Sequence, residues 1–239
     1  MRKREFTAYQ LCISIMIPVI LLFSVFYGNN VVTTMYESSP LPNRKTVIID
    51  AGHGGEDGGA ISCTGIYESR LNLEISVRLE AMLNLMGIRT VMIRREDISV
   101  HTQGTTIAQR KVSDLKHRVN IVNSQTDAIL VSIHQNTFND QRYQGAQVFY
   151  AGTSDSDRLA KQIQSDLVNN LNIGSNREAK KAAGIYLMDN IEITGVLVEC
   201  GFLSNPEEET MLTDPVYQKK LCCVLATSLS RFLYSSSIA

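Results

Sequence analysis

Three segments of the 239-residue sequence place histidine or glutamate at the end of a short apolar run. The first run ends in Asp50-Ala51-Gly52-His53, the second in Ser132-Ile133-His134 and the third in Val198-Glu199-Cys200. Glu68 follows His53 by fifteen residues and stands at the start of a helical pattern. Because ligand sites in α/β proteins form where parallel strands end, these polar groups are candidates for one shared site.

Two imidazoles and one carboxylate are a ligand set that suits Zn²⁺ and leaves a position for water. The candidate ligands here are His53, Glu68 and His134. Zinc lowers the pKa of a bound water from 15.7 to about 7. Glu199 is then the spare carboxylate, which can take a proton from the water and return it to a leaving amine. This combination predicts metal-assisted hydrolysis of an amide.

Simpler interpretations exist for each of these residues taken alone. A lone histidine in a turn is more often structural than a ligand. Glu68 can serve as a favourable charge at a helix N-terminus, and Glu199 can form an ion pair with Arg118. The glycine-rich stretch 52–59 does not match a nucleotide-binding motif, because Asp57 stands where the third glycine is required. Its glycines favour close backbone approach around His53 instead.

The rest of the chain predicts one α/β domain spanning residues 45–235. Short β-branched apolar runs alternate with longer patterns of helical period, and the runs are apolar on both faces. We therefore expect a three-layer domain with a mostly parallel mixed sheet of about six strands, covered by helices. The expected strands are 46–50, 89–94, 127–134, 145–151, 185–188 and 194–200, and the expected helices are 68–86, 111–123, 156–171, one that begins at Pro206, and 216–233.

The N-terminal residues 1–30 predict a membrane anchor or a signal peptide. A basic start, Arg2-Lys3-Arg4, precedes the apolar stretch 11–26, and the wider stretch 8–27 is long enough to span a bilayer. No small-x-small cleavage site is evident, which favours the uncleaved anchor. Residues 31–44 predict a linker. Under either interpretation the domain that follows is exported.

Charge and cysteine content narrow the class of protein further. With 23 Lys+Arg against 24 Asp+Glu, the net charge is -1, which argues against a nucleic-acid-binding protein with a basic face. The cysteines outside the apolar stretch show no CxxC spacing. We expect them to be small core or near-core residues rather than a disulfide framework, namely Cys63, Cys200, Cys222 and Cys223.

Four separated motifs together resemble the zinc-dependent N-acetylmuramoyl-L-alanine amidases of the amidase-3 type. They are Val47–Ala60, Glu68, Ser132–Asn136 and Val198–Asn205, in this order. The resemblance implies that His53, Glu68 and His134 hold one Zn²⁺ and that Glu199 is the catalytic acid/base. It also suggests Asn136 and Arg118 as substrate-positioning residues, although Arg118 equally suits a structural partner on its helix.

The resemblance further implies a substrate and a biological setting. The family hydrolyses the amide between N-acetylmuramic acid and L-alanine of peptidoglycan, and this chain is most similar to the cortex amidases of spore-forming bacteria. An exported enzyme, held by its N-terminal membrane segment or secreted, and a regulatory protein partner are the corresponding expectations. The alternatives from the residues are a non-catalytic peptidoglycan-binding domain and a zinc-dependent deacetylase.

Overall fold

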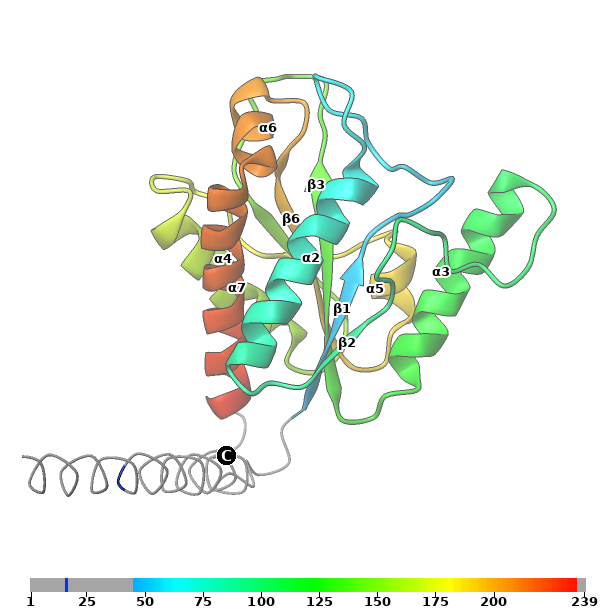
Figure 1. Ribbon diagram of the computed structural model, residues 1–239, viewed down its shortest axis with the longest axis horizontal. Coiled ribbons are helices and arrows are strands. Elements are labelled where there is room, and N and C mark those ends of the chain that lie inside the picture. Colours follow the sequence, from blue (N-terminus) through cyan, green and yellow to red (C-terminus); the bar gives the residue numbers. More distant parts are fainter. Residues whose placement is uncertain (1–15, 17–44, 236–239) are drawn as a thin grey trace, which may run out of the picture. The chain divides into compact units, whose positions relative to one another are not determined.

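The computed structural model describes residue 16 and residues 45–235. The chain divides after Asn43, and the unit Arg44–Ala239 contains every element that positions the candidate site (Figure 1). Those elements are β1 Thr46–Ala51, α2 Glu68–Leu85, β2 Thr90–Met92, α3 Ile107–Asn123, β3 Ala128–Asn136, β4 Gln147–Tyr150, α4 Ser156–Asn170, β5 Lys180–Lys181, α5 Tyr186–Asn190, β6 Thr194–Phe202, α6 Pro206–Thr213 and α7 Pro215–Ser235.

The strands form one six-stranded sheet in the order β2-β1-β3-β6-β4-β5. β1 pairs in parallel with β2 and β3, and β3 pairs in parallel with β6. β4 runs antiparallel to β6, and the short β5 is parallel to β4. The predicted mostly parallel mixed sheet is therefore confirmed. The carboxyl ends of β1, β3 and β6 lie side by side at one edge of the sheet.

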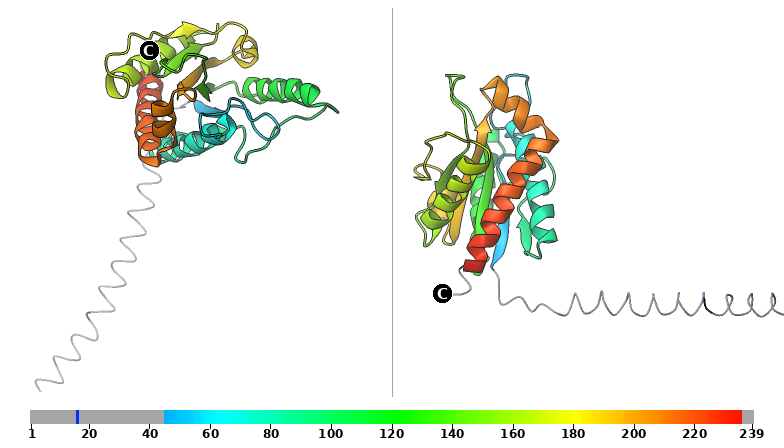
Figure 2. Two further views of the ribbon diagram at one scale, coloured as in Figure 1. Left: turned by 90° about the horizontal axis from the view of Figure 1, so that it is seen from above. Right: turned by 90° about the vertical axis from the view of Figure 1, so that its left-hand side faces the viewer.

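Helices cover both faces of this sheet, as the two orthogonal views show (Figure 2). Alternate residues of the central strands point to opposite faces. Ile49, Val131 and Val198 belong to the larger core cluster with residues of α2, α4 and α7. Ile48 and Leu130 belong to the second cluster, with residues of α3 and α5. Burial on both faces explains why the strands read as continuous apolar runs.

The strand predicted at residues 185–188 is wrong, because this segment begins the short helix α5. Leu187 and Met188 point their side chains into the second core cluster. A run of four apolar residues has no period that separates a strand from one buried helical turn. The sixth strand is instead β5, two exposed lysines that the hydrophobic pattern could not reveal.

Capping residues set the first residue of α3 and of α6. α3 begins at Ile107 rather than residue 111, because Thr106 and Gln109 form a reciprocal capping box. Its first turn is exposed and lacks the apolar spacing on which the prediction depended. α6 begins at Pro206 as expected, and the Asn205 side chain caps it by accepting from the backbone amides of Glu207 and Glu208.

The expected core position of the cysteines holds for only two of the four. Cys200 and Cys222 are buried, whereas Cys63 and Cys223 are exposed. The Cys63 thiol lies at 3.4 Å from the carbonyl oxygens of Leu203 and Ser204. All four are free thiols, so no disulfide framework is present in the part of the chain that is described.

The predicted anchor or signal peptide, residues 1–30, and the predicted linker, residues 31–44, lie outside the described residues apart from Met16. Across residue 16 and residues 45–235, no helix combines the length and the apolar character needed to cross a bilayer.

Candidate active site

The candidate site lies at the carboxyl edge of the sheet, where β1, β3 and β6 end. His53 follows β1 by two residues, and His134 lies near the end of β3. Glu199 of β6 is the register partner of His134. Glu68 is the first residue of α2, the helix that follows the β1 loop. The predicted convergence of strand-end residues on one edge is thus what the fold produces.

Glu68 contacts both histidines through its two carboxylate oxygens. His53 Nε2 lies 3.2 Å from Glu68 Oε2, and His134 Nδ1 lies 2.9 Å from Glu68 Oε1. The two imidazole rings meet edge to face with centroids 5.0 Å apart. One donor atom from each of the three residues falls within 4.8 Å of the others. Two nitrogens and a carboxylate at this spacing are a suitable donor set for Zn²⁺.

The loop that carries His53 has an unusual backbone that the glycine-rich sequence makes possible. His53 itself adopts φ of 60°, a conformation that is uncommon for residues other than glycine. A Cβ atom on Gly52 would stand 2.2 Å from His134 Nε2, and one on Gly59 would stand 2.5 Å from Glu68 Oε2. Glycine at positions 52 and 59 therefore leaves the space that the His134 and Glu68 side chains occupy.

The Glu68 carboxylate is held by three further donors. Oε1 accepts from Asn72 Nδ2 and from the Gln135 backbone amide, both at 3.1 Å. Oε2 accepts from the Ala60 amide at 2.9 Å. Burial opposes ionisation, but the hydrogen bonds from His134 and His53 hold the pKa of Glu68 far below its usual value. Glu68 is therefore an ionised carboxylate with a fixed orientation, although it is almost fully buried.

Asn72 and Gln135 form a supporting chain that the sequence reasoning missed. Gln135 Nε2 donates to Asn72 Oδ1 at 3.2 Å, which leaves the Asn72 amide group to donate to Glu68 and to the Gly52 carbonyl. Asn72 is fully buried. Its position one helical turn after Glu68 was the available signal, because residues four apart share a helix face.

Asp57 supports His53 in a comparable way. Asp57 Oδ2 lies 2.9 Å from His53 Nδ1, and Asp57 Oδ1 accepts from Lys111 Nζ at 3.1 Å. Burial lowers the pKa of His53, but the hydrogen bonds to Asp57 and Glu68 outweigh it and raise the pKa to about 9. A carboxylate on the outer nitrogen of a ligating histidine fixes the ring orientation and the tautomer. Asp57 thus leaves Nε2 as the nitrogen that faces the cluster.

Glu199 differs from Glu68 in the hydrogen bonding of its carboxyl group. Its Oε2 atom is buried and has no hydrogen-bond partner among the described residues. Burial, opposed by the charge of His134, raises the pKa of Glu199 to about 7. A carboxyl group that exchanges a proton near neutral pH suits general acid/base chemistry. Cys200, the next residue, is buried in the larger core cluster on the other face of the strand.

Arg118 does not pair with Glu199. Its guanidinium donates to Asp50 Oδ1, to Asp114 Oδ2 at 2.6 Å and to the carbonyls of Ala51 and His53. Only 2% of Arg118 is exposed. Burial raises the pKa of Asp50, but the charge of Arg118 outweighs it and the pKa is lowered. This arrangement is that of a structural ion pair beneath the His53 loop.

Asn136, the other residue suggested for substrate positioning, ends β3 two residues beyond His134. It is partly exposed, and its Oδ1 accepts from the Thr137 amide at 2.8 Å. The Asn136 carbonyl accepts from Leu203 at 2.8 Å and so joins the segments that follow β3 and β6. The residue lies at the correct edge of the sheet to contact a bound substrate.

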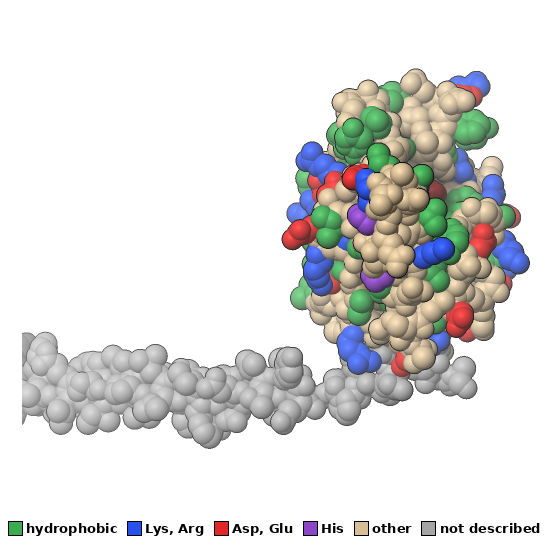
Figure 3. All heavy atoms as spheres, turned by 90° about the vertical axis from the view of Figure 1, so that its right-hand side faces the viewer, with side chains coloured by type: hydrophobic (Ala, Val, Ile, Leu, Met, Phe, Trp, Pro, Cys, Tyr) green, Lys and Arg blue, Asp and Glu red, His purple; other side chains and the backbone are tan. Residues whose placement is uncertain are grey.

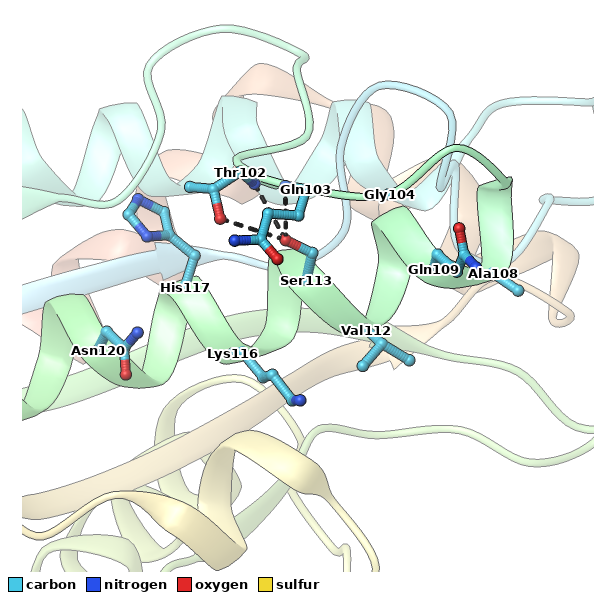
Figure 4. Close-up of a pocket in the computed structure, with 10 residues that line it drawn as sticks. All are labelled: Thr102, Gln103, Gly104, Ala108, Gln109, Val112, Ser113, Lys116, His117 and Asn120. Carbon is cyan, nitrogen blue, oxygen red and sulfur yellow. Dashed lines mark hydrogen bonds between the residues drawn. The ribbon is translucent and has the colours of Figure 1, made fainter.

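A cavity of about 710 Å³ lies elsewhere, along α3 (Figure 4). Thr102 and Gln103 line this cavity. Their backbone amides both donate to Ser113 Oγ at 3.0 Å. Figure 3 shows acidic, basic and hydrophobic side chains interspersed over the side of the molecule on which α3 lies. The cavity contains none of the four site residues, so its size does not identify the active site.

A His-Glu-His cluster beside a buried carboxyl group is an arrangement typical of metal-dependent hydrolases. The described residues contain one such group of possible metal-holding side chains. Residues 47–231 match the amidase-3 family, N-acetylmuramoyl-L-alanine amidase. The chain belongs to this family, as the sequence resemblance predicted.

Individual relatives agree with the family match. The germination-specific N-acetylmuramoyl-L-alanine amidase of Bacillus subtilis is 37% identical, over 90% of this chain and 90% of its own length. The structure of the CwlD amidase from Clostridioides difficile, in complex with the GerS lipoprotein, is 36% identical with a TM-score of 0.76, and the match covers 80% of this chain and 99% of that one. An N-acetylmuramoyl-L-alanine amidase from Clostridium difficile 630 is 30% identical, with a TM-score of 0.70 and coverage of 81% and 99%. The chain is thus a peptidoglycan amidase by family and by fold.

Proposed function

We propose that His53, Glu68 and His134 hold one Zn²⁺ and that Glu199 is the acid/base for cleavage of the N-acetylmuramoyl-L-alanine amide. The observation that carries this proposal is the contact of Glu68 with both histidines, beside Glu199, whose buried Oε2 atom has no hydrogen-bond partner among the described residues. When bound, zinc supplies a Lewis acid that polarises the substrate carbonyl and lowers the pKa of water. Contacts from outside the cluster orient two of the three proposed ligands, His53 through Asp57 and Glu68 through Asn72 and two backbone amides.

Glu199 transfers the proton in this scheme. Its carboxylate accepts a proton from the attacking water as the new C–O bond forms at the lactyl carbonyl. The same proton then passes to the alanine nitrogen as the C–N bond breaks, so that the amine leaves in neutral form. A pKa of about 7 lets Glu199 perform both steps at neutral pH. Asn136 is proposed to orient the substrate at the strand edge. Arg118 is proposed to act by holding the His53 loop, because its donors are already used.

The biological setting is also a proposal. The Bacillus subtilis relative is named germination-specific, and a role in maturation of the spore cortex, by preparing muramic acid for δ-lactam formation, is proposed for this chain. The CwlD structure contains the GerS lipoprotein, which supports a protein partner here as well. Action outside the cytoplasm fits a peptidoglycan substrate. Export and membrane attachment through residues 1–30 are proposed from the sequence of that segment alone.

Mass spectrometry of muropeptides tests this function directly. Peptidoglycan is incubated with the purified protein and zinc, with and without a chelator. We expect free stem peptides that begin with L-alanine and glycan without peptide, in the zinc samples only. Release of acetate with the lactyl–L-alanine amide intact would assign a deacetylase instead. Binding to peptidoglycan without any new product would assign the non-catalytic binding domain.

A further inference from the structure

Three aromatic side chains form a small cluster beside the candidate active site, here called the aromatic shelf: Phe138, Tyr143 and Phe202. The ring centroids of Phe138 and Tyr143 are 4.5 Å apart, and those of Tyr143 and Phe202 are 6.1 Å apart. Phe202 is buried, whereas Phe138 is 51% and Tyr143 46% exposed. Two adjoining rings that keep half of their surface in solvent form a patch available to a ligand.

The aromatic shelf continues the edge of the sheet that carries the catalytic residues. Phe138 follows His134 by four residues, so a chain that extends at most 3.6 Å per residue keeps their Cα atoms within about 14 Å. Phe202 follows Glu199 by three residues and is the register partner of Asn136. In Figure 1 the green segment after β3 continues past the sheet at the end where α6 lies. The shelf is therefore within reach of a substrate bound at the site.

Several hydrogen bonds hold the aromatic shelf in place. The Phe138 amide donates to Ser204 Oγ at 3.0 Å, and Asn205 Nδ2 donates to the Tyr143 carbonyl at 3.3 Å. The buried Glu208 carboxylate accepts from the amides of Gly145 and Phe202, both at 2.8 Å. These bonds join the loop 137–145 to the segment that follows Glu199. The exposed rings are thus presented on a supported loop, which reduces the entropy lost on binding.

The two basic side chains around the aromatic shelf are both engaged in other contacts. Arg142, the basic residue of the loop, forms a bidentate ion pair with Asp140. Its guanidinium nitrogens lie 2.7 to 3.1 Å from the Asp140 carboxylate oxygens. Arg177 lies over the Phe202 ring at 4.9 Å and donates to the Gln144 carbonyl and to Gln147 Oε1. An exposed pair of aromatic rings, with Arg142 bound to Asp140 and Arg177 placed over the buried Phe202, suits an uncharged sugar ring better than the carboxylates of a stem peptide.

We propose that Phe138 and Tyr143 bind a neutral sugar ring of the glycan strand, next to the muramic acid whose peptide is removed. The C–H face of a pyranose packs against the electron-rich face of an aromatic ring, and tyrosine adds a hydroxyl for hydrogen bonding. This inference rests on the proposed function, because it places the scissile amide at the zinc cluster. It makes the enzyme selective for polymeric glycan over an isolated muramoyl peptide.

The test compares two substrates and one binding probe for the double variant Phe138→Ala/Tyr143→Ala. For uncrosslinked glycan strands that carry stem peptides, we expect KM to rise about tenfold, as loss of about 1.4 kcal/mol of stacking requires. For a single N-acetylmuramoyl peptide we expect the parent KM. The matched control is Ile173→Ala, which removes an 84% exposed side chain outside the shelf and is expected to change neither value.

Binding of tetra-N-acetylchitotetraose to the metal-free protein gives a readout that needs no catalysis. Calorimetry should show weaker binding for the double variant and parent binding for Ile173→Ala, while Tyr143→Phe keeps most of the affinity. Equal binding by the parent and the double variant would contradict a sugar-binding role of the aromatic shelf. An equal increase of KM on both substrates would contradict it as well. Weaker binding by the double variant, together with a parent protein that does not hydrolyse peptidoglycan, would support the sugar-binding role of the aromatic shelf and refute the proposed function.

Discussion

His134 and Glu199 are register partners in the parallel pairing of β3 with β6. Paired residues on neighbouring parallel strands project from the same face of a sheet, so a candidate ligand and the candidate acid/base are brought together by backbone hydrogen bonding. Their neighbours Ile133 and Val198 are fully buried on the other face and fix that register. The two side chains differ in their hydrogen bonding, since His134 Nδ1 lies beside Glu68 and Glu199 Oε2 has no hydrogen-bond partner among the described residues.

The raised pKa of His53 makes zinc binding dependent on pH. At neutral pH the metal-free His53 carries a proton, because its bonds to Asp57 and Glu68 outweigh burial and raise its pKa to about 9. A ligating imidazole must be neutral, so zinc has to displace that proton. We expect zinc affinity measured by calorimetry to increase from pH 6.5 to about 9 and then to level off. Affinity that is constant over this range would contradict the protonated state.

Replacement of Asp57 tests the same contact from its other side. Asp57→Asn removes the charge that favours the imidazolium form, so the pH at which affinity levels off should move down. The loss of a carboxylate that orients the ring should also weaken zinc binding at pH 9 by about 10- to 100-fold. The control is Asp157→Asn on the exposed surface of α4, which should change neither quantity. An unchanged pH profile for Asp57→Asn would remove Asp57 from the metal site.

The same raised pKa predicts how the stability of the metal-free protein changes with pH. His53 is protonated more readily in the folded chain than in the unfolded one, whose reference pKa is 6.5. Its stabilising contribution is fully present below pH 6.5 and is lost as the pH rises through about 9. We expect the free energy of unfolding in urea to fall across this interval in the parent and to fall less in Asp57→Asn. An equal slope in both proteins would contradict the linkage.

Gly52 tests whether close packing of the loop is needed for metal binding. An alanine Cβ at this position would stand 2.2 Å from His134 Nε2 and would displace the ring. We expect Gly52→Ala to lose bound zinc, as measured by metal analysis of the purified protein. Gly152→Ala is the matched control, because its Cβ would meet Lys181 Cε at an ordinary 3.6 Å. Full zinc content in Gly52→Ala would show that the loop tolerates a side chain there.

Arg118 separates a structural role from a role in substrate positioning. Arg118→Leu would leave the carboxylates of Asp50 and Asp114 buried without their partner, and we expect a cost of about 3–5 kcal/mol in urea unfolding. Arg70→Leu, which breaks an exposed pair with Glu74, should cost no more than about 1 kcal/mol. Unchanged stability of Arg118→Leu together with a raised KM would instead favour substrate positioning.

The sequence was sufficient to predict most of the sheet and the convergence of the four candidate site residues at its edge. Strands buried on both faces read as apolar runs, and polar residues at their ends stand out against that background. The amphipathic spacing of α2 placed Glu68 at a helix start, where the structure has it. The prediction of a strand at residues 185–188 was wrong, because a short apolar run is equally compatible with a strand and with the helix α5.

The supporting residues could not be predicted in the same way. Asn72 and Gln135 are polar residues in apolar surroundings, and no spacing rule reveals that their side chains meet across 63 positions of sequence. The sequence alone is compatible with two roles for Arg118, because its partner Asp50 lies 68 positions away in the chain. Long-range contacts of this kind depend on the packing of α2 and α3 on the sheet, which no local pattern contains.

The variant Glu199→Gln tests the central claim most directly. It keeps the size of the side chain but cannot accept and return a proton, and it lies outside the three proposed ligands. Zinc content and muropeptide products are measured together for parent and variant, with His53→Ala as the control that should lose both metal and activity. The account predicts that Glu199→Gln retains zinc and loses about 10²- to 10⁴-fold in amide hydrolysis. Turnover at the parent rate with zinc bound would contradict it.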